Sequence, residues 1–296
     1  MADTLGVVAL DTGTLTISAE ISGPTGGRPM ILLHGWPDDP RTWDALLPEL
    51  HAAGYRTIVP YLRGFGPTVF HQSATVSGDL EALGQDVLDL MDRLGLAEAV
   101  VVGHDWGARA AYVAAHAAPE RIRACVAISV GWGTNTADQP LPLNQAQDYW
   151  YHWFFATPYG AARLREDPRG FARYIWTIWM PDFPAALAGF EATADAFDNP
   201  AWPDVTIHSY AMRWGNAPAN PQYDALRAAQ RADRTIRVPT LMLHGGADPV
   251  TAAWTSEGKD GLFTGRYERH VLPGLNHFPT REAPDAVARH ILAFLG

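Results

Sequence analysis

Asp105 is the residue whose surroundings most clearly predict chemistry. It is the centre of the string Gly103-His104-Asp105-Trp106-Gly107, between the apolar run Val100-Val101-Val102 and a helical pattern. This order is typical of a nucleophile elbow, G-x-nucleophile-x-G, a sharp turn from strand to helix that tolerates only small flanking residues. A carboxylate in that place can attack saturated carbon by in-line displacement, which leaves an alkyl ester on the enzyme. Because water must then cleave the ester, the sequence predicts a reaction in two steps.

Four other residues supply what the second step needs. His277, in the string Gly274-Leu275-Asn276-His277-Phe278-Pro279, is suited to remove a proton from water. Asp248, after the apolar run 241–243, would fix the tautomer of this histidine and stabilise its imidazolium form. The backbone N–H groups of Trp36 and Trp106 would stabilise the oxyanion that forms when water attacks the ester.

These strings resemble the α/β-hydrolase superfamily with an aspartate nucleophile, over nearly the whole chain. The strings at 34–37 (His-Gly-Trp-Pro) and 103–107 look like the HGxP and GHDWG strings of its epoxide hydrolases. The chain order of nucleophile, acid and base is also that of the superfamily. The resemblance implies that an epoxide is hydrolysed to a vicinal diol through a covalent alkyl-aspartyl ester.

The resemblance also assigns acids for the epoxide oxygen, which leaves as an alkoxide. Epoxide hydrolases of this kind use two tyrosines of a cap, and the best matches are Tyr151 and Tyr210, with Tyr149 as an alternative to Tyr151. A phenol with a reference pKa of about 10 stays protonated at neutral pH and can donate to oxygen.

Haloalkane and haloacetate dehalogenases share the architecture and form the alternative hypothesis. The run Tyr151-His152-Trp153, with Tyr210, resembles the halide pocket of fluoroacetate dehalogenases, and Arg109 matches one of their two carboxylate-binding arginines. However, Trp106 stands where those enzymes have their second arginine, so one of the two arginines that would bind a small carboxylate is missing. Their acid follows the strand after the elbow helix, where 128–132 contains no carboxylate. Both departures favour the epoxide.

Two questions stay open at this stage. Arg109 either binds an acidic substrate or pairs with a protein carboxylate under the cap. A protein that binds a ligand without turnover is a third hypothesis, which predicts an incomplete triad, whereas all three triad residues are present.

No pair of histidines has the spacing of a zinc site, and no glycine string suits a phosphate or a dinucleotide. We therefore expect neither a metal nor a cofactor.

The elements that must position these residues follow an alternating pattern. Short apolar runs at 30–33, 57–59, 99–103, 124–129, 239–243 and 267–272 indicate strands, and 42–53, 80–94, 108–118 and 283–295 indicate helices. Continuous apolar runs are typical of parallel strands buried on both faces. The sequence predicts an α/β class, the α/β-hydrolase fold, with a mostly parallel central sheet flanked by helices. Its core domain comprises 1–131 and 231–296, and 132–230, rich in tryptophan and interrupted by prolines, forms an inserted helical cap.

The composition limits the partners. The chain has 296 residues, of which 47% are hydrophobic, and 22 basic against 32 acidic residues give a net charge of −10. This charge opposes binding to nucleic acid or to anionic membranes, so the expected partner is a small-molecule substrate. The lone Cys125 lies in an apolar run, and neither a signal peptide nor a membrane span is evident, which predicts a cytoplasmic protein. The sequence leaves open whether it forms a homodimer.

Overall fold

A central sheet organises the computed structural model, which describes residues 6–134 and 140–296. In these residues the sheet has nine strands, eight of them in the order β1-β2-β4-β3-β6-β7-β8-β9, with β5 beside β2. Their bounds are β1 Gly6–Asp11, β2 Leu15–Ser22, β3 Arg28–Leu33, β4 Tyr55–Pro60, β5 Val69–Phe70, β6 Ala99–His104, β7 Ile122–Ile128, β8 Thr240–Gly245 and β9 Tyr267–Leu272. From β4 to β9 the neighbours in this order are parallel, whereas β2 is antiparallel to β1, β4 and β5. The predicted mostly parallel sheet is confirmed.

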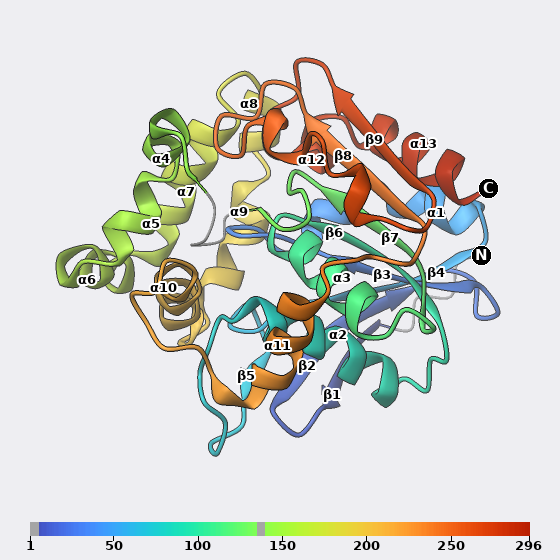
Figure 1. Cartoon of the computed structure of the whole chain (residues 1–296), viewed down its shortest axis with the longest axis horizontal. Coiled ribbons are helices and arrows are strands. Elements are labelled where there is room, and N and C mark those ends of the chain that lie inside the picture. The colour runs from blue at the N-terminus through green and yellow to red at the C-terminus, as the bar shows by residue number, and fades with distance from the viewer. Residues whose placement is uncertain (1–5, 135–139) are drawn as a thin grey trace.

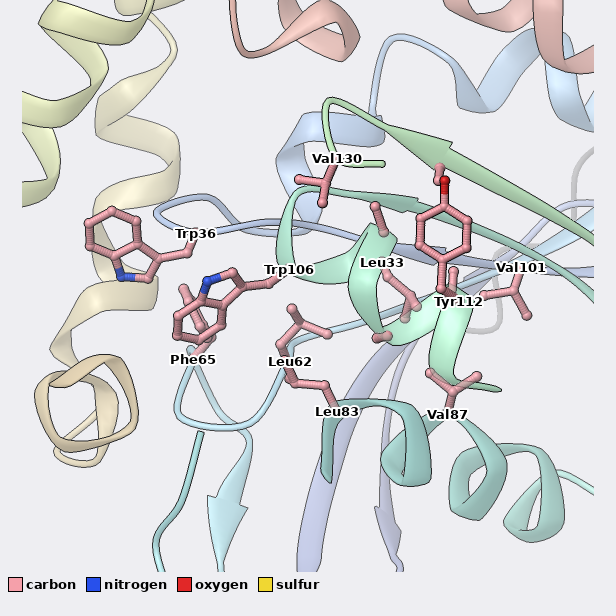
Figure 2. Packing of buried hydrophobic residues seen from close by; sticks show 14 of the residues in the cluster. Leu33, Trp36, Leu62, Phe65, Leu83, Val87, Val101, Trp106, Tyr112 and Val130 are labelled. Carbon is pink, nitrogen blue, oxygen red and sulfur yellow. The ribbon is translucent and has the colours of Figure 1, made fainter. Parts of the chain in front are cut away.

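Helices bury both faces of this sheet. Side chains of a strand point to alternate faces, and in β3 Ile31 and Leu33 join one apolar cluster while Met30 and Leu32 join the other. Figure 2 shows Leu33 on the face that is covered by α2 (Leu80–Arg93) and α3 (Trp106–Ala117). The first face packs on α2 and α3, the second on α1 (Leu47–Ala52) and α13 (Pro284–Leu295). This two-sided burial explains why the central strands are continuous apolar runs.

The segment between β7 and β8 is helical in its described residues. Figure 1 shows α4 to α7 and α10 together on the side of the molecule opposite the C-terminal helix α13. The bounds are α4 Leu143–Asp148, α5 Trp150–Phe155, α6 Pro158–Glu166, α7 Pro168–Trp179, α8 Pro184–Leu187, α9 Phe190–Thr193, α10 Trp202–Arg213 and α11 Asp224–Ala232. α11, the last helix of this segment, contacts the residue before α2, because Arg227 Nη2 forms an ion pair with Asp79 Oδ1 at 2.8 Å.

Some expectations stay predictions and one is wrong. Nothing in the structure divides the chain at 132–230, and residues 1–5 and 135–139 of the predicted core and cap lie outside the described residues. The single helix expected at 42–53 is instead a 3-10 helix, Pro40–Trp43, followed by α1. Pro48 explains the break, because a proline fits the first turn of a helix and disrupts its interior.

None of the described helices combines the length and the apolar composition that a bilayer crossing requires. Partners, location and homodimer formation stay predictions.

Candidate active site

Asp105 occupies the turn between β6 and α3 with a strained backbone. Its φ of 49° and ψ of −109° lie in a region that side chains other than glycine rarely adopt, at a cost on the order of 1–3 kcal/mol. The neighbours allow no Cβ at the flanking glycines. A Cβ on Gly103 would lie 2.0 Å from the carbonyl oxygen of Gly107, and one on Gly107 would lie 2.2 Å from that of Leu33. The G-x-Asp-x-G spacing is therefore a packing requirement of the elbow.

The two carboxylate oxygens of Asp105 have different surroundings. Oδ1 accepts a hydrogen bond from the backbone N–H of Trp36 at 2.9 Å. Oδ2 lies 3.7 Å from His277 Nε2, an ion-pair contact that is too long for a hydrogen bond. Burial opposes ionisation of Asp105, but the neighbouring His277, His104 and the Trp36 N–H outweigh it and lower its pKa to about 2. The carboxylate is therefore ionised, with Oδ2 left as the nucleophilic oxygen.

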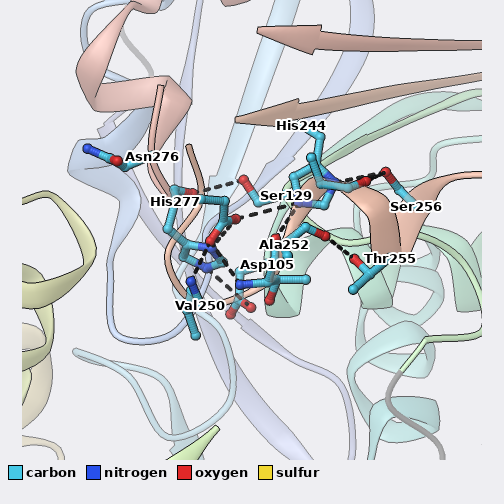
Figure 3. A network of polar contacts seen from close by, with 12 residues as sticks. Asp105, Ser129, His244, Val250, Ala252, Thr255, Ser256, Asn276 and His277 are labelled. Atoms are coloured by element: carbon cyan, nitrogen blue, oxygen red, sulfur yellow. Dashed lines mark hydrogen bonds and ion pairs between the residues drawn. The ribbon is translucent and has the colours of Figure 1, made fainter. Parts of the chain in front are cut away.

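His277 and Asp248 form the second half of the triad. His277 Nδ1 donates to Asp248 Oδ2 at 2.8 Å, and Asp248 Oδ1 accepts from the backbone N–H groups of Val250 and Thr251 at 2.9 and 2.8 Å. Figure 3 shows His277 between the segment after β8 and Asp105. Burial would lower the pKa of His277, but the charges of Asp248 and Asp105 outweigh burial and raise it to about 10. The histidine is thus positively charged while Asp105 is ionised.

The backbone of His277 is held by two neighbouring side chains. Its carbonyl oxygen accepts from Ser129 Oγ at 2.8 Å and from His104 Nε2 at 2.7 Å. Ser129 follows β7 with a φ of 68°, and His104 is the residue before the nucleophile. A third histidine, His244, lies at the end of β8, and its Nε2 is 3.6 Å from Asp248 Oδ2. These contacts connect the base to the ends of three adjacent strands.

Aromatic side chains from α5 and α10 contact the two tryptophans of the site, Trp36 and Trp106. Tyr151 stacks on Trp36 with ring centroids 5.3 Å apart, and Tyr210 meets Tyr151 edge to face at 5.1 Å. The indole N–H of Trp106 donates to the Tyr210 hydroxyl at 3.2 Å. Burial raises the pKa of both phenols well above 10, and the charge of Asp105 adds to this. Both phenols are therefore protonated, and the Tyr210 oxygen already accepts one hydrogen bond.

The remaining predicted site residues divide into two groups. Arg109 and His152 are buried, and the His152 ring stacks on Tyr210 at 4.3 Å. Trp153, in contrast, is 36% exposed and its indole N–H donates to the carbonyl oxygen of Ala146, so the structure does not bring it to Asp105. The hydroxyl of Tyr149 donates to Thr251 at 3.5 Å.

Two further expectations concern Trp106 and metal ions. Among the described hydrogen bonds, none joins the backbone N–H of Trp106 to the Asp105 carboxylate, so its role in the oxyanion hole stays a prediction. No group of three or more His, Cys, Asp or Glu side chains within 6–134 and 140–296 could hold a metal ion. That the reaction needs no metal or cofactor also stays a prediction.

Comparisons with known proteins identify the family. Residues 28–283 match the family described as the α/β hydrolase fold. The chain is 37% identical to an epoxide hydrolase of Caballeronia sordidicola, over 98% of this chain and 94% of that protein. It is 28% identical to epoxide hydrolase A of Mycobacterium tuberculosis, over 97% of this chain and 96% of that protein.

A solved structure agrees with these relatives. The crystal structure of a candidate epoxide hydrolase from Klebsiella pneumoniae matches with a TM-score of 0.91 at 35% identity, covering 97% of this chain and 96% of that one. The fold and the resemblance predicted from the sequence are thereby confirmed. The chain is a hydrolase that belongs to the α/β-hydrolase fold family and is similar to the epoxide hydrolases of that family.

Proposed function

We propose that this enzyme hydrolyses an epoxide to a vicinal diol through an alkyl ester on Asp105. The observation that carries the proposal is the unequal engagement of the Asp105 oxygens: Oδ1 accepts from the Trp36 N–H, and Oδ2 lies 3.7 Å from His277 Nε2. Two protonated phenols are near enough for the charge of Asp105 to raise their pKa. A small-molecule epoxide fits this arrangement, because it needs a nucleophile on carbon and acids on oxygen. Relatives named as epoxide hydrolases support the same substrate class.

In the first step, Asp105 Oδ2 attacks an epoxide carbon and the bond from that carbon to the ring oxygen breaks. The leaving oxygen takes a proton from a phenol, Tyr210 or Tyr151. Because the Tyr210 oxygen accepts from the Trp106 indole, its own hydrogen is left for the substrate. The protonated His277 returns a proton to the phenolate, which leaves the histidine neutral. The charge of Asp105 is then lost in the ester, so the attraction that held the proton on His277 is weaker.

In the second step, neutral His277 removes a proton from water, and the resulting hydroxide attacks the carbonyl carbon of the Asp105 ester. The oxyanion forms on Oδ1, where the Trp36 N–H already donates, so little reorganisation is needed. When this intermediate collapses, its bond to the alkoxide breaks and the alkoxide takes the proton of the added hydroxyl, which releases the diol. The Asp105 carboxylate is restored and His277 stays protonated. Protons and charges therefore return to their starting positions after one cycle.

The dehalogenase alternative has weaker support. A halide pocket made by Tyr151, His152, Trp153 and Tyr210 would need the Trp153 indole N–H, which donates to Ala146 instead. A ligand-binding protein without turnover is also disfavoured, because the three triad side chains are in contact. Measuring diol from styrene oxide and fluoride from fluoroacetate with the same preparation separates the three hypotheses.

The ester is tested by trapping it. His277→Gln removes the base of the second step, so styrene oxide should add one substrate mass to the protein, on Asp105, as seen by intact-protein and peptide mass spectrometry. The matched control is Asp105→Ala with His277→Gln, which should take up no substrate. An adduct on another residue, or full turnover by His277→Gln, would contradict the mechanism.

The phenols are tested by removing each hydroxyl. Tyr151→Phe and Tyr210→Phe should each slow the formation of the ester by about 10²-fold, the contribution expected of a general acid, and leave its hydrolysis little changed. Tyr149→Phe is the matched control, because the Tyr149 hydroxyl donates to Thr251. If Tyr149→Phe slows alkylation in pre-steady-state experiments and Tyr151→Phe does not, the assignment of the first acid is wrong.

A further inference from the structure

Besides His277 Nε2 and His104 Nδ1, three buried nitrogen atoms near the nucleophile have no hydrogen-bond partner among the described residues. They are Arg109 Nε, His152 Nε2 and Arg213 Nε. The three residues are only 6%, 1% and 7% exposed. A buried polar group without a partner loses its hydration and gains nothing in return, so such groups are rare and need an explanation.

All three atoms can only donate. An arginine has no acceptor at any nitrogen. In His152, Nδ1 accepts from the indole N–H of Trp214 at 3.0 Å, which leaves the proton on Nε2. Burial and the two arginines lower the pKa of His152 well below its usual value, so the ring is neutral and Nε2 carries the only N–H. These three side chains therefore offer three donors that no acceptor of the described residues meets.

The three side chains surround Tyr210 and Trp106. Arg213 follows Tyr210 by one turn of α10, and its Cζ lies 4.8 Å from the Tyr210 ring centroid and 5.8 Å from that of Trp106. The His152 ring lies 4.3 Å from that of Tyr210. Arg109 follows Asp105 by one turn of α3, where residues three and four apart share a face. The Trp106–Tyr210 hydrogen bond joins the two helices.

Neither arginine forms an ion pair with a carboxylate of the described residues. Arg109 donates to the carbonyl oxygen of Thr134 and Arg213 to Ser209 Oγ, each at 3.1 Å. Arg63 provides a contrast within the same protein, since it is equally buried and donates to both oxygens of Asp86 at 2.7 Å. Burial and Arg213 lower the pKa of Arg109 to about 10, so it still carries its charge at neutral pH. Unpaired buried cations are costly, which indicates that a ligand supplies the missing anion.

We propose that Arg109, Arg213 and His152 bind a carboxylate of the substrate, so that the enzyme acts on an epoxide that carries a carboxylate group. A carboxylate only accepts hydrogen bonds and matches the forked donors of arginine, which complements three unpaired donors. A neutral, apolar epoxide would leave them unpaired. This inference rests on the proposed function, and it takes up the open question about Arg109: no carboxylate within 6–134 and 140–296 forms an ion pair with this arginine, which leaves it for an acidic substrate.

Turnover of a matched pair of substrates tests the proposal. 3-Phenylglycidate and 3-phenylglycidamide have nearly the same shape, but only the first is charged. We expect wild-type kcat/KM to be higher for the carboxylate, and we expect Arg213→Gln or Arg109→Gln to lower the carboxylate-to-amide ratio by about 10- to 100-fold, the range for hydrogen bonds to charged groups. Arg213→Lys keeps the charge and should retain part of the ratio. Arg165→Gln, on the exposed cap surface, is the control and should retain all of it.

A binding experiment separates this inference from the proposed function. Asp105→Asn cannot turn over, and calorimetry with cinnamate and its neutral amide then reports anion binding alone. Cinnamate should bind more tightly than cinnamamide, and adding Arg213→Gln should remove the difference. If neither epoxide is hydrolysed, the proposed function fails while this experiment still decides the anion site. Equal affinity for the two probes, or a wild-type preference for the amide substrate, would overturn the inference.

Discussion

Replacing Asp105 with asparagine should lower the pKa of His277, because it removes the negative charge opposite the ring. Oδ2 lies 3.7 Å from Nε2. At that distance two unit charges attract by about 4 kcal/mol with an effective dielectric constant of roughly 20. That energy is roughly a thousandfold change in proton affinity, enough to move the pKa of His277 from about 10 toward neutrality. Asp105→Asn has the same charge as the ester, so it reproduces the electrostatic state in which His277 must act as a base.

The assay is an NMR titration of the protein with labelled histidine, in which the spectrum of His277→Gln identifies the His277 signal. Glu268→Gln is the control, since Glu268 Oε2 lies 3.3 Å from His270 Nε2 but both side chains are more than one-third exposed. Water and salt screen charges at that exposed position, so the control should leave the pKa of His277 unchanged. A change in His277 of less than tenfold in proton affinity, or any increase, would refute the idea that forming the ester converts this histidine into a base.

Three other predictions follow from the same geometry. Asp248→Asn should slow hydrolysis of the ester by 10²-fold or more and alkylation much less, because it removes the acceptor of His277 Nδ1; single-turnover kinetics measure both steps, and equal effects would contradict this assignment. Gly107→Ala should lower the free energy of unfolding by about 1–3 kcal/mol or more in urea titrations, because its Cβ would lie 2.2 Å from the Leu33 oxygen; an unchanged midpoint would count against the close approach. The raised pKa of His277 stabilises the fold fully below about pH 6.5, and this contribution is lost as pH rises through about 10. Wild type should therefore lose more stability than His277→Gln between pH 7 and 10, and equal losses would contradict the raised pKa.

The core part of the site was predictable because each of its side chains follows a strand of the parallel sheet. Asp105 and Asp248 come after the apolar runs that became β6 and β8, and His277 comes shortly after β9. The ends of adjacent parallel strands meet at one edge of the sheet, so chain order and apolar runs were sufficient to bring these residues together. The glycines on both sides of Asp105 added the turn, since a Cβ at either would collide with backbone.

Other parts of the fold had a weaker signal. The strands β1 and β2 were not predicted, because β1 alternates half-buried with exposed residues, unlike the continuous apolar runs of the inner strands. Ser129 was not predicted as a partner of His277 either. Its hydroxyl reaches a backbone carbonyl 148 residues away, a contact that depends on the positive φ of one residue and has no sequence motif.

The site residues of the helical segment between β7 and β8 show a different limit. The tyrosines could be proposed only by resemblance, and contacts between residues far apart in the chain favour Tyr151 over Tyr149: Tyr151 meets Tyr210, whereas the Tyr149 hydroxyl donates to Thr251. No role of its own could be assigned to Arg213 from the sequence, because an arginine one turn after a tyrosine is ordinary on any helix. Its importance appears only when every buried donor is matched with an acceptor and some donors remain. The chemistry of such an enzyme can therefore be predicted from strand ends in the sequence, whereas its substrate must be inferred from the buried groups that the fold leaves unpaired.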